Sequence, residues 1–374
     1  MKWNKLKVED FADVVGGGTP STSNASLWDG DIPWITPKDL SGYEARFIER
    51  GERYITEEGL RKSSAQMLPT GAVLLSTRAP VGYVAIAENP LCTNQGFKSL
   101  IPKPETASNE FIYYLLKQNR SFLESQSSGS TYKELNGGRL KQLLFPIPPI
   151  QIQHRIASIL SAYDDLIENN LRRIKLLEES AGLLYKEWFV RLRFPGYEHI
   201  RIIDGVPEGW EKKKLGEVIE LKYGKSLKEP DRIEGPYPVY GSSGVIGTHD
   251  RFLVKGPGII VGRKGNAGTV FWSDTDFFPI DTVYYIDTTQ SGYFIFQNLQ
   301  HQNFQSSHGA VPGLNREYAY SLSIFLPTKL LLNEFEEAVS PLYGQLFKLK
   351  TMNEKLRQAR DLLLPKLMSG EVEV

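Results

Sequence analysis

Ile147-Pro148-Pro149-Ile150-Gln151 and Leu326-Pro327-Thr328-Lys329-Leu330 are the two stretches that decide the fold of this 374-residue chain. Each stretch ends a segment of mixed α and β character and begins a long helical run, Gln151 to Phe189 in the first case and Leu330 to Met368 in the second. A constant offset of 179 positions relates the two stretches and the helical patterns behind them. A repeat of this length predicts two duplicated domains rather than a solenoid of short units.

The two helical runs share a seam of apolar residues. From Ile156 to Trp188, and again from Phe335 to Leu367, these residues alternate at spacings of four and three, which is the pattern of a coiled coil. Each seam contains one asparagine, Asn170 in the first helix and Asn353 in the second. Facing the two asparagines in an antiparallel pair aligns the seams end to end, so we predict that arrangement. The alternative is that each helix packs separately on its own domain.

Together these patterns predict an α+β fold in four parts. Two mixed α/β domains, at residues 1–149 and 193–328, alternate with long helices at residues 150–192 and 329–374. We expect the mixed domains at opposite ends of a long antiparallel two-helix coiled coil, related by a pseudo-two-fold axis. Each helix has about 38 residues, so at 1.5 Å per residue the coiled coil would be roughly 55–60 Å long.

A strand pair and a polar loop recur in the two mixed domains. Residues 72–76 and 82–86 predict strands joined by a turn at Arg78-Ala79-Pro80. Residues 258–262 and 268–272 repeat the arrangement. Polar loops follow at residues 127–131 and 306–309, and Leu135-Asn136 behind the first loop corresponds to Leu314-Asn315 behind the second. Between strands and loop of the first domain, residues 109–124 predict one helix.

Composition narrows the class of protein. The formal net charge is zero, which excludes a highly basic polyanion-binding protein but leaves room for local basic patches. No apolar stretch is long enough to span a membrane, and the N-terminus lacks the apolar core of a signal peptide. The single cysteine, Cys92, fits a reducing compartment and is expected to be a small buried hydrophobic residue. These features predict a cytoplasmic protein.

Catalytic and metal-binding signatures are missing from the sequence. There is no phosphate loop of the G-x-x-x-x-G-K-[ST] type, and the glycine-rich residues 262–268 are better interpreted as a hairpin turn. The motif of base methyltransferases, Asn or Asp followed by Pro-Pro and an aromatic residue, does not occur. The five histidines show no ligand spacing, and no C-x-x-C is present. We therefore expect no catalytic residue and no metal site.

Several stretches resemble the specificity subunits of type I restriction–modification systems. They are Gly16-Gly17-Gly18-Thr19-Pro20-Ser21, Leu27-Trp28-Asp29-Gly30-Asp31-Ile32-Pro33-Trp34-Ile35-Thr36-Pro37-Lys38-Asp39-Leu40, Leu75-Ser76-Thr77-Arg78, Thr93-Asn94-Gln95-Gly96-Phe97 and Pro148-Pro149-Ile150-Gln151-Ile152-Gln153. Residues 359–371 resemble the C-terminal end of that family. The second mixed domain resembles it more weakly, through residues 240–244 and 262–265.

This resemblance implies a non-catalytic, DNA-binding subunit. Each mixed domain would be a target-recognition domain that contacts one half of an interrupted double-stranded DNA sequence. The helices would separate these domains and dock two methyltransferase subunits, which methylate adenine at N6 with S-adenosylmethionine. Restriction subunits that use ATP and Mg would complete the complex. No cofactor would be bound by this chain, in agreement with the missing catalytic motifs.

Residues for DNA contact are sought among the amides, hydroxyls and cations of predicted turns, because Arg, Lys, Asn and Gln contact base edges and phosphates. In the first domain the candidates are Thr19, Ser21, Lys38, Arg78, Tyr83, Asn94, Gln95, Ser128, Ser130, Thr131 and Lys133. In the second they are Lys222, Tyr223, Lys225, Tyr240, Ser242, Ser243, Arg263, Lys264, Asn266, Ser307, His308 and Arg316.

Arg78 and Arg263 are the strongest single candidates. Each is expected in the turn between the two strands of its own domain, so we expect the two arginines to be counterparts. If Arg263 contacts a base, Arg263→Ala would weaken specific binding by about 1–3 kcal/mol. For each candidate, a purely structural role in a turn is the competing interpretation; Ser21 and Asn94 could simply cap local backbone.

The sequence leaves three functions open. The first is the DNA specificity subunit described above. The second is the specificity part of a fused restriction–methylation enzyme, which would need a methyltransferase domain ahead of Trp3. The third is a non-catalytic coiled-coil adaptor that does not bind nucleic acid. Salt-dependent, sequence-selective DNA binding would separate the third from the other two.

Overall fold

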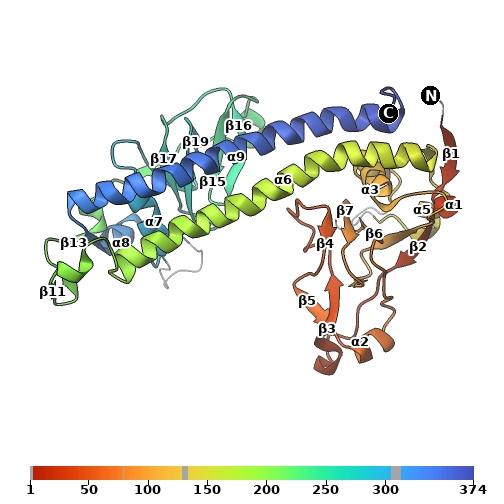
Figure 1. Ribbon diagram of the computed structural model, residues 1–374, viewed down its shortest axis with the longest axis horizontal. Coiled ribbons are helices and arrows are strands. Elements are labelled where there is room, and N and C mark those ends of the chain that lie inside the picture. The colour runs from red at the N-terminus through yellow and green to blue at the C-terminus, as the bar shows by residue number, and fades with distance from the viewer. Residues whose placement is uncertain (1–2, 79, 129–133, 305–312) are drawn as a thin grey trace. The chain divides into compact units, whose positions relative to one another are not determined.

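The computed structural model describes residues 3–78, 80–128, 134–304 and 313–374 and divides the chain into two compact units. Unit 1 comprises Met1–Arg172 and Thr351–Val374, and unit 2 comprises Arg173–Lys350. The two predicted long helices are present as α6 (Ile150–Tyr185) and α9 (Lys329–Ser369), and each contributes residues to both units (Figure 1). A π-helical turn, η2 (Lys186–Val190), continues α6.

Unit 1 is built on two small sheets. The first has the strand order β2-β9-β6-β7-β4 and the second the order β5-β3-β8. The strands of the first sheet are β2 (Ala12–Gly16), β9 (Lys98–Pro102), β6 (Val73–Thr77), β7 (Val81–Ala87) and β4 (Phe47–Ile48). Those of the second are β5 (Arg53–Ile55), β3 (Trp28–Ile35) and β8 (Cys92–Thr93). The predicted strand pair is therefore present as the antiparallel hairpin of β6 and β7.

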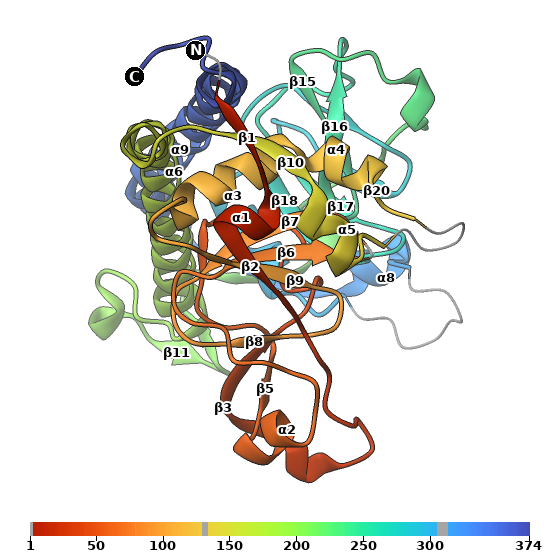
Figure 2. The same ribbon diagram turned by 90° about the vertical axis from the view of Figure 1, so that its right-hand side faces the viewer.

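Alternation along β6 separates two cores. Val73 and Leu75 point into a cluster with Phe111 of α3 (Asn109–Gln118), whereas Leu74 points into a cluster with Ile35 of β3. Figure 2 shows α3 on one side of the five-stranded sheet and the small β5-β3-β8 sheet on the other. Cys92 lies in a third apolar cluster beside Trp34, as expected for a buried hydrophobic residue, and burial raises the pKa of its thiol to about 11.

The single helix predicted at residues 109–124 is wrong, because the structure has two helices, α3 and α4 (Arg120–Ser125). Asn119 separates them, with φ −98° and ψ 19°. Its side-chain amide donates to the carbonyl of Leu115 at 2.8 Å, a carbonyl that already accepts from the Asn119 backbone. This local bond competes with continuation of the helix.

In each unit, the strand just ahead of a long helix pairs antiparallel with a strand near the start of the mixed domain. In unit 1, β1 (Asn4–Lys7) pairs with β10 (Leu144–Ile147). In unit 2, β13 (Glu211–Lys214) pairs with β21 (Ser323–Leu326). Prolines follow both closing strands, at positions 148 and 327, just before α6 and α9 begin.

Unit 2 also contains two small sheets, with the orders β14-β20-β17-β18 and β16-β15-β19. The strands of the first are β14 (Lys222–Tyr223), β20 (Val283–Ile286), β17 (Gly258–Gly262) and β18 (Val270–Ser273). Those of the second are β16 (Gly244–His249), β15 (Tyr237–Gly241) and β19 (Phe278–Pro279). A short hairpin of β11 (Ile202–Ile203) and β12 (Val206–Pro207) precedes them.

The remaining elements are short. In unit 1 they are α1 (Val8–Phe11), η1 (Ala25–Leu27), α2 (Glu57–Arg61) and α5 (Gly137–Gln142). In unit 2 they are η3 (Tyr197–His199), η4 (Leu215–Glu217), η5 (Glu229–Asp231), α7 (Tyr293–His301) and α8 (Arg316–Ser321).

Segments of α6 and α9 pack as antiparallel neighbours inside each unit. In unit 1, Asn170 Nδ2 donates to Asn353 Oδ1 at 2.8 Å, and Asn353 donates in turn to the carbonyl of Ile167 at 3.3 Å. In unit 2, the ring of Trp188, in the π-helical turn that continues α6, lies 5.8 Å from the ring of Phe335 of α9, measured between centroids. The two asparagines thus meet as the seam spacing predicts, and both are buried.

Candidate nucleic-acid interface

A pocket of about 310 Å³ in unit 1 brings together candidates from three separate loops. Its lining residues are Thr36, Pro37, Lys38, Arg78, Asn94, Gln95 and Gly96. The first three follow β3, Arg78 follows β6, and the last three lie between β8 and β9. Four of the eleven residues predicted for the first domain therefore line one pocket.

Local hydrogen bonds give the pocket a defined shape. Asp39 Oδ2 accepts from the backbone amide of Thr36 at 2.7 Å and from its hydroxyl at 2.6 Å, which fixes the turn that carries Lys38. Asn94 Oδ1 accepts from the Gly96 amide at 2.9 Å. The side chain of Asn94 therefore has the capping role that was its competing interpretation, while still lining the pocket.

The pocket offers groups that suit DNA. Arg78 is exposed, and its side chain has no hydrogen bond or ion pair with any residue in the described ranges. Lys38 forms an exposed ion pair with Glu52 at 2.8 Å; the hydrogen bond to that carboxylate raises the pKa of Lys38. A guanidinium with free donors beside the Gln95 amide can contact base edges, and the Lys38 ammonium can contact a phosphate.

The glycine run ahead of the pocket is required by close packing. A Cβ on Gly17 would lie 1.9 Å from the carbonyl oxygen of Asn94, and a Cβ on Gly18 would lie 2.2 Å from the Ala65 amide nitrogen. The Gly18 amide donates to the Thr93 carbonyl at 2.9 Å, and the Trp34 indole donates to the Gly18 carbonyl at 2.9 Å. This packing brings Thr19 to the pocket, where its hydroxyl donates to Gln95 Oε1.

The other candidates of the first domain lie apart from this pocket lining. Ser21 is exposed, shares a hydrogen bond with Ser23, and accepts from the Trp28 indole through its carbonyl. Tyr83 lies on β7 beneath the guanidinium of Arg120, 5.4 Å from the ring centroid. Ser128 bonds through its backbone to Glu134. The predictions for Ser130, Thr131 and Lys133 lie outside the described residues.

The residues that directly follow the polar loops are held in the same way in the two units. In unit 1 the Leu135 amide donates to the Thr77 carbonyl at 3.0 Å, and the backbones of Arg78 and Glu134 form an isolated antiparallel β-bridge. In unit 2 the Leu314 amide donates to the Arg263 carbonyl at 2.8 Å, and the backbones of Lys264 and Gly313 form the corresponding antiparallel β-bridge. Asn136 and Asn315 then cap α5 and α8.

This pattern corrects the predicted correspondence of the arginines. The residue equivalent to Arg78 is Lys264, and the residue equivalent to Arg263 is Thr77. Lys264 is exposed and, like Arg78, has no side-chain partner within the part of the chain that the structure describes. The prediction failed by one position because ladder register, which sets equivalence, cannot be read from the turn residues alone.

Arg263 and Arg316 converge on one tyrosine in unit 2. Their guanidinium carbons lie 4.9 Å and 5.1 Å from the ring centroid of Tyr223. The Tyr223 ring packs edge-on against Tyr284, with centroids 5.1 Å apart. Burial raises the pKa of Tyr284 to about 12, so this second ring is neutral at ordinary pH. We call Tyr223, Arg263 and Arg316 the Tyr223 cluster.

Two predicted contacts of the second domain are engaged elsewhere. Lys222 is ion-paired with Asp287 at 2.6 Å, and the hydrogen bond from Lys222 lowers the pKa of that carboxyl. Tyr240 is a correction: only 8% of it is exposed, and its ring packs against Phe277 in an apolar cluster. Tyr240 belongs to strand β15, where Val239, Tyr240 and Gly241 are all buried, and not to the turn that follows it.

The remaining polar candidates of unit 2 lie on adjoining turns. Ser242 accepts from the Thr269 hydroxyl through its carbonyl at 2.8 Å, and Asn266 reaches the Ser243 hydroxyl at 3.4 Å. Lys225 is exposed, and its backbone amide donates to the Pro279 carbonyl. Ser307 and His308 lie outside the described residues. The turns of unit 2 therefore carry hydroxyl, amide and ammonium groups, the kinds of group that contact DNA.

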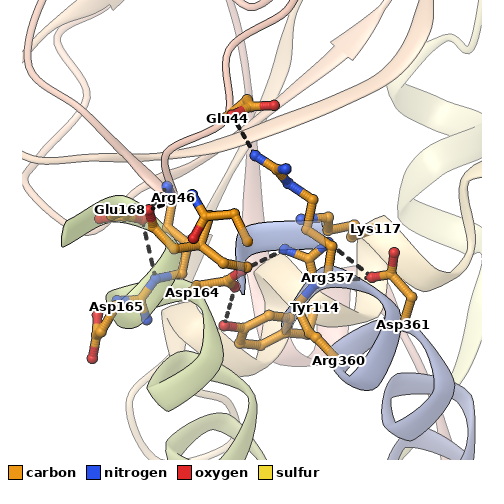
Figure 3. A network of polar contacts seen from close by, with 12 residues as sticks. Glu44, Arg46, Tyr114, Lys117, Asp164, Asp165, Glu168, Arg357, Arg360 and Asp361 are labelled. Carbon is orange, nitrogen blue, oxygen red and sulfur yellow. Dashed lines mark hydrogen bonds and ion pairs between the residues drawn. The ribbon is translucent and has the colours of Figure 1, made fainter. Parts of the chain in front are cut away.

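A buried polar network in unit 1 joins the mixed domain to the long helices (Figure 3). Asp164 of α6 accepts from the Tyr114 hydroxyl at 2.6 Å and from Arg360 of α9 at 2.5 Å. Arg360 also pairs with Asp361 at 2.8 Å. Burial raises the pKa of the Tyr114 hydroxyl and lowers that of the neighbouring Lys117 ammonium.

Arg46 forms the second half of this network. Its side chain is buried and pairs with Glu110 of α3 at 3.0 Å and with Asp165 of α6. Its backbone amide donates to Glu168 at 2.9 Å, and Glu44, two residues earlier, pairs with Arg357 of α9 at 2.7 Å. Sequence reasoning missed these residues because their partners lie far apart along the chain. The one available signal was Arg360, a charged residue at an apolar seam position.

The described residues contain neither a cluster that could hold a metal ion nor a helix that could span a membrane. Nowhere in the described ranges do three or more His, Cys, Asp or Glu side chains come close enough together to hold a metal ion. Among the helices that the structure describes, none is long and apolar enough to cross a membrane.

Known proteins resemble this chain along its whole length. The type I restriction modification DNA specificity domain matches residues 1–179 and 207–329. The type I restriction enzyme MjaIX specificity subunit of Methanocaldococcus jannaschii is 34% identical over 413 aligned positions, covering 100% of this chain and 94% of that protein. The EcoR124I/EcoR124II specificity subunit of Escherichia coli is 31% identical over 44% of this chain and 41% of its own.

Solved structures agree at the level of the fold. The S subunit of a type I restriction–modification system from M. genitalium has a TM-score of 0.59 at 20% identity, covering 98% of this chain and 96% of that one. The mixed domains, the long helices and the sequence matches lead to one conclusion: the chain belongs to the family of type I restriction–modification specificity subunits, which are non-catalytic targeting subunits.

Proposed function

We propose that this chain recognises an interrupted double-stranded DNA sequence, with one half-site contacted by residues 1–149 and the other by residues 193–328. One observation carries the proposal. Each unit presents an exposed cation, Arg78 or Lys264, at the same place beside its polar loop. Two equivalent basic sites on divergent domains suit one DNA molecule with two different half-sequences.

The long helices would set the distance between the half-sites. The support is local: within each unit, segments of α6 and α9 are antiparallel neighbours. Extended over both helices, that pairing gives a single antiparallel coiled coil with the recognition domains at opposite ends and a pseudo-two-fold axis across it. The helices would occupy residues 150–192 and 329–374. A fixed coiled coil between two DNA-binding domains makes spacer length a geometric property.

The pseudo-symmetric helices would also bind the partners. Two methyltransferase subunits would dock on equivalent faces, carry S-adenosylmethionine and methylate adenine in the recognised site. Restriction subunits would supply ATP- and Mg-dependent cleavage. The cofactors would then belong to the partners, and this chain would contribute binding, orientation and sequence choice.

Exchanging one recognition domain tests the proposal. Residues 193–328 would be replaced by the corresponding segment of another specificity subunit with a known target, and methylated adenines would be mapped in cells with the complete system. The expected result is a hybrid site in which one half-sequence changes and the other stays. Unchanged methylation, or a change in both halves, would contradict it, and a chain that binds no DNA in its complex would leave an adaptor role.

A further inference from the structure

The Tyr223 cluster has a geometry that no other described part of the interface has. Three side chains from different elements meet: Tyr223 of β14, Arg263 directly after β17, and Arg316 at the start of α8. Tyr223 is 47% exposed, so the cluster is open to a ligand. Both guanidinium groups are within 6 Å of the same ring, the range of a cation–π contact.

Each arginine is held in place by neutral groups. Arg263 Nη1 donates to the Asp281 carbonyl at 3.0 Å, and its guanidinium also lies 5.8 Å from the Tyr284 ring. Arg316 lies 5.8 Å from a second ring, that of Tyr320. Stacking restricts a guanidinium while leaving N–H donors at its edge available. The cluster is therefore ordered before any ligand arrives.

Positive charge in the cluster is poorly compensated. Arg263 has no ion pair with the residues that the structure describes. Arg316 Nε lies 3.9 Å from Glu317 and is buried without a hydrogen-bond partner. Lys222, next in sequence to Tyr223, is by contrast neutralised by Asp287 at 2.6 Å. Two like charges near one ring repel each other, and an anion between them relieves that repulsion.

The described residues of unit 1 form no equivalent cluster. The backbone pattern aligns Arg263 with Thr77, and the offset of 179 aligns Arg316 with Gly137. Among the residues that the structure describes, the cluster is therefore confined to unit 2, while the exposed cation at Arg78 and Lys264 is common to both units. The Tyr223 cluster is therefore a site distinct from the exposed cation that the two units share.

We propose that Arg263 and Arg316 together bind one backbone phosphate of DNA at the half-site contacted by unit 2, with Tyr223 as the ring that orients both guanidinium groups. The inference rests on the proposed function. A phosphate is favoured over a guanine base because it supplies the negative charge that two poorly compensated cations need, whereas the guanine edge offers neutral acceptors that one arginine saturates.

Salt dependence of DNA binding tests this inference, using the full chain assembled with its methyltransferase subunit. The logarithm of the binding constant falls with the logarithm of salt concentration, with a slope of about −0.9 per phosphate neutralised. Arg263→Gln and Arg316→Gln would each reduce the magnitude of the slope. Because the two residues share one phosphate, the double variant would reduce it by about 0.9 in total, not about 1.8.

Sequence preference gives the second readout. Both variants would weaken binding to cognate and non-cognate duplexes by the same factor, and the methylated sequence in cells would stay unchanged. Arg263→Lys retains the charge and would keep the slope. Tyr223→Phe would match the parent, while Tyr223→Ser would weaken binding in the same direction as the arginine variants.

Arg251→Gln is a matched control, since this exposed arginine of unit 2 lies outside the cluster. Its slope would stay that of the parent, and an equal loss there would overturn the inference as a general effect of charge. Relaxed preference at one base pair with an unchanged slope would identify base contact instead. A parent complex that shows no salt-dependent, sequence-selective binding would refute the proposed function itself, whereas a normal parent with unaffected variants would refute only the phosphate site.

Discussion

Arg78 and Lys264 occupy equivalent positions, yet they differ in what they can distinguish. A guanidinium presents a planar fork that bonds two acceptors of a guanine edge, whereas an ammonium acts as a point charge. Arg78 also lies in a pocket with the amides of Asn94 and Gln95, which suit base contacts. We infer that Arg78 contributes to sequence choice in the first half-site.

Arg78→Ala is therefore expected to lower affinity for the cognate duplex by about 1–3 kcal/mol and to relax preference at one base pair. Arg78→Lys, which keeps the charge and loses the fork, would relax the preference with a smaller loss of affinity. Competition binding against duplexes altered at single positions measures both effects. Equal losses on cognate and altered duplexes would mean that Arg78 contacts phosphate and not a base.

The Lys222–Asp287 pair makes a prediction for pH. The folded state lowers the pKa of Asp287, chiefly through its hydrogen bond with Lys222. A depressed carboxyl pKa adds stability that is present above the ordinary value and is lost as the pH falls through the folded value. The same bond raises the pKa of Lys222, so that contribution is lost only as the pH rises past the ordinary range of lysine.

Asp287→Asn should thus flatten the acid side of the stability curve, so that unit 2 loses less melting temperature between pH 5 and pH 3 than the parent does. Thermal unfolding at a series of pH values measures this. Asp281→Asn is the matched control, because among the described residues only the backbone carbonyl of Asp281 has a partner, Arg263. An acid side as steep in Asp287→Asn as in the parent would contradict the assignment.

At the scale of elements, the polar network of unit 1 contains a nearly inaccessible ion pair. The side chains of Arg360 and Asp164 are 10% and 4% exposed. Removing one partner of such a pair leaves an uncompensated charge and is costly, whereas replacing both with apolar residues is often tolerated.

Asp164→Leu should destabilise the chain by about 3–5 kcal/mol, and the double variant Asp164→Leu/Arg360→Leu should recover most of that loss. Denaturant unfolding followed by far-ultraviolet circular dichroism measures the difference. Arg191→Leu, in an exposed pair with Glu187, serves as the control with little expected change. A double variant no more stable than Asp164→Leu would show that the network acts through Tyr114 or other partners rather than this pair.

Elements governed by local patterns could be predicted from sequence. The long helices, the β6–β7 hairpin and the meeting of Asn170 with Asn353 follow from periodicity and spacing. The break at Asn119 escaped prediction because a single side-chain hydrogen bond ends α3 inside an otherwise helical pattern. The Arg46 and Asp164 network escaped because its members lie on distant segments that only the tertiary fold brings together.

The candidate site was predictable in part for the same reason. Turn residues identified Arg78, Asn94, Gln95 and Lys38 without showing that they share one pocket. The equivalence of Arg78 with Lys264 depends on ladder register, and the burial of Tyr240 depends on its packing against Phe277 in the folded unit. Neither property is contained in residue type alone.

At the scale of the whole molecule, the proposed coiled coil makes spacer length adjustable. Seven residues inserted in register in each long helix, at the Arg172–Arg173 and Lys350–Thr351 borders, would lengthen it by about 10 Å. The spacer between the half-sites should then grow by up to about 3 base pairs, while both half-sequences stay the same. Mapping methylation with matched four-residue insertions, which shift the apolar seam, provides the comparison. A spacer that ignores the insertion would contradict this role of the helices.

One chain is proposed to specify two half-sequences through two domains, each domain specifying one half. The most direct measurement maps methylated adenines across the DNA of cells that express the complete system. The expected result is one interrupted sequence, with two specified halves separated by a fixed number of unspecified base pairs, and its loss when this chain is deleted. A continuous recognition sequence, or methylation that persists without this chain, would contradict it.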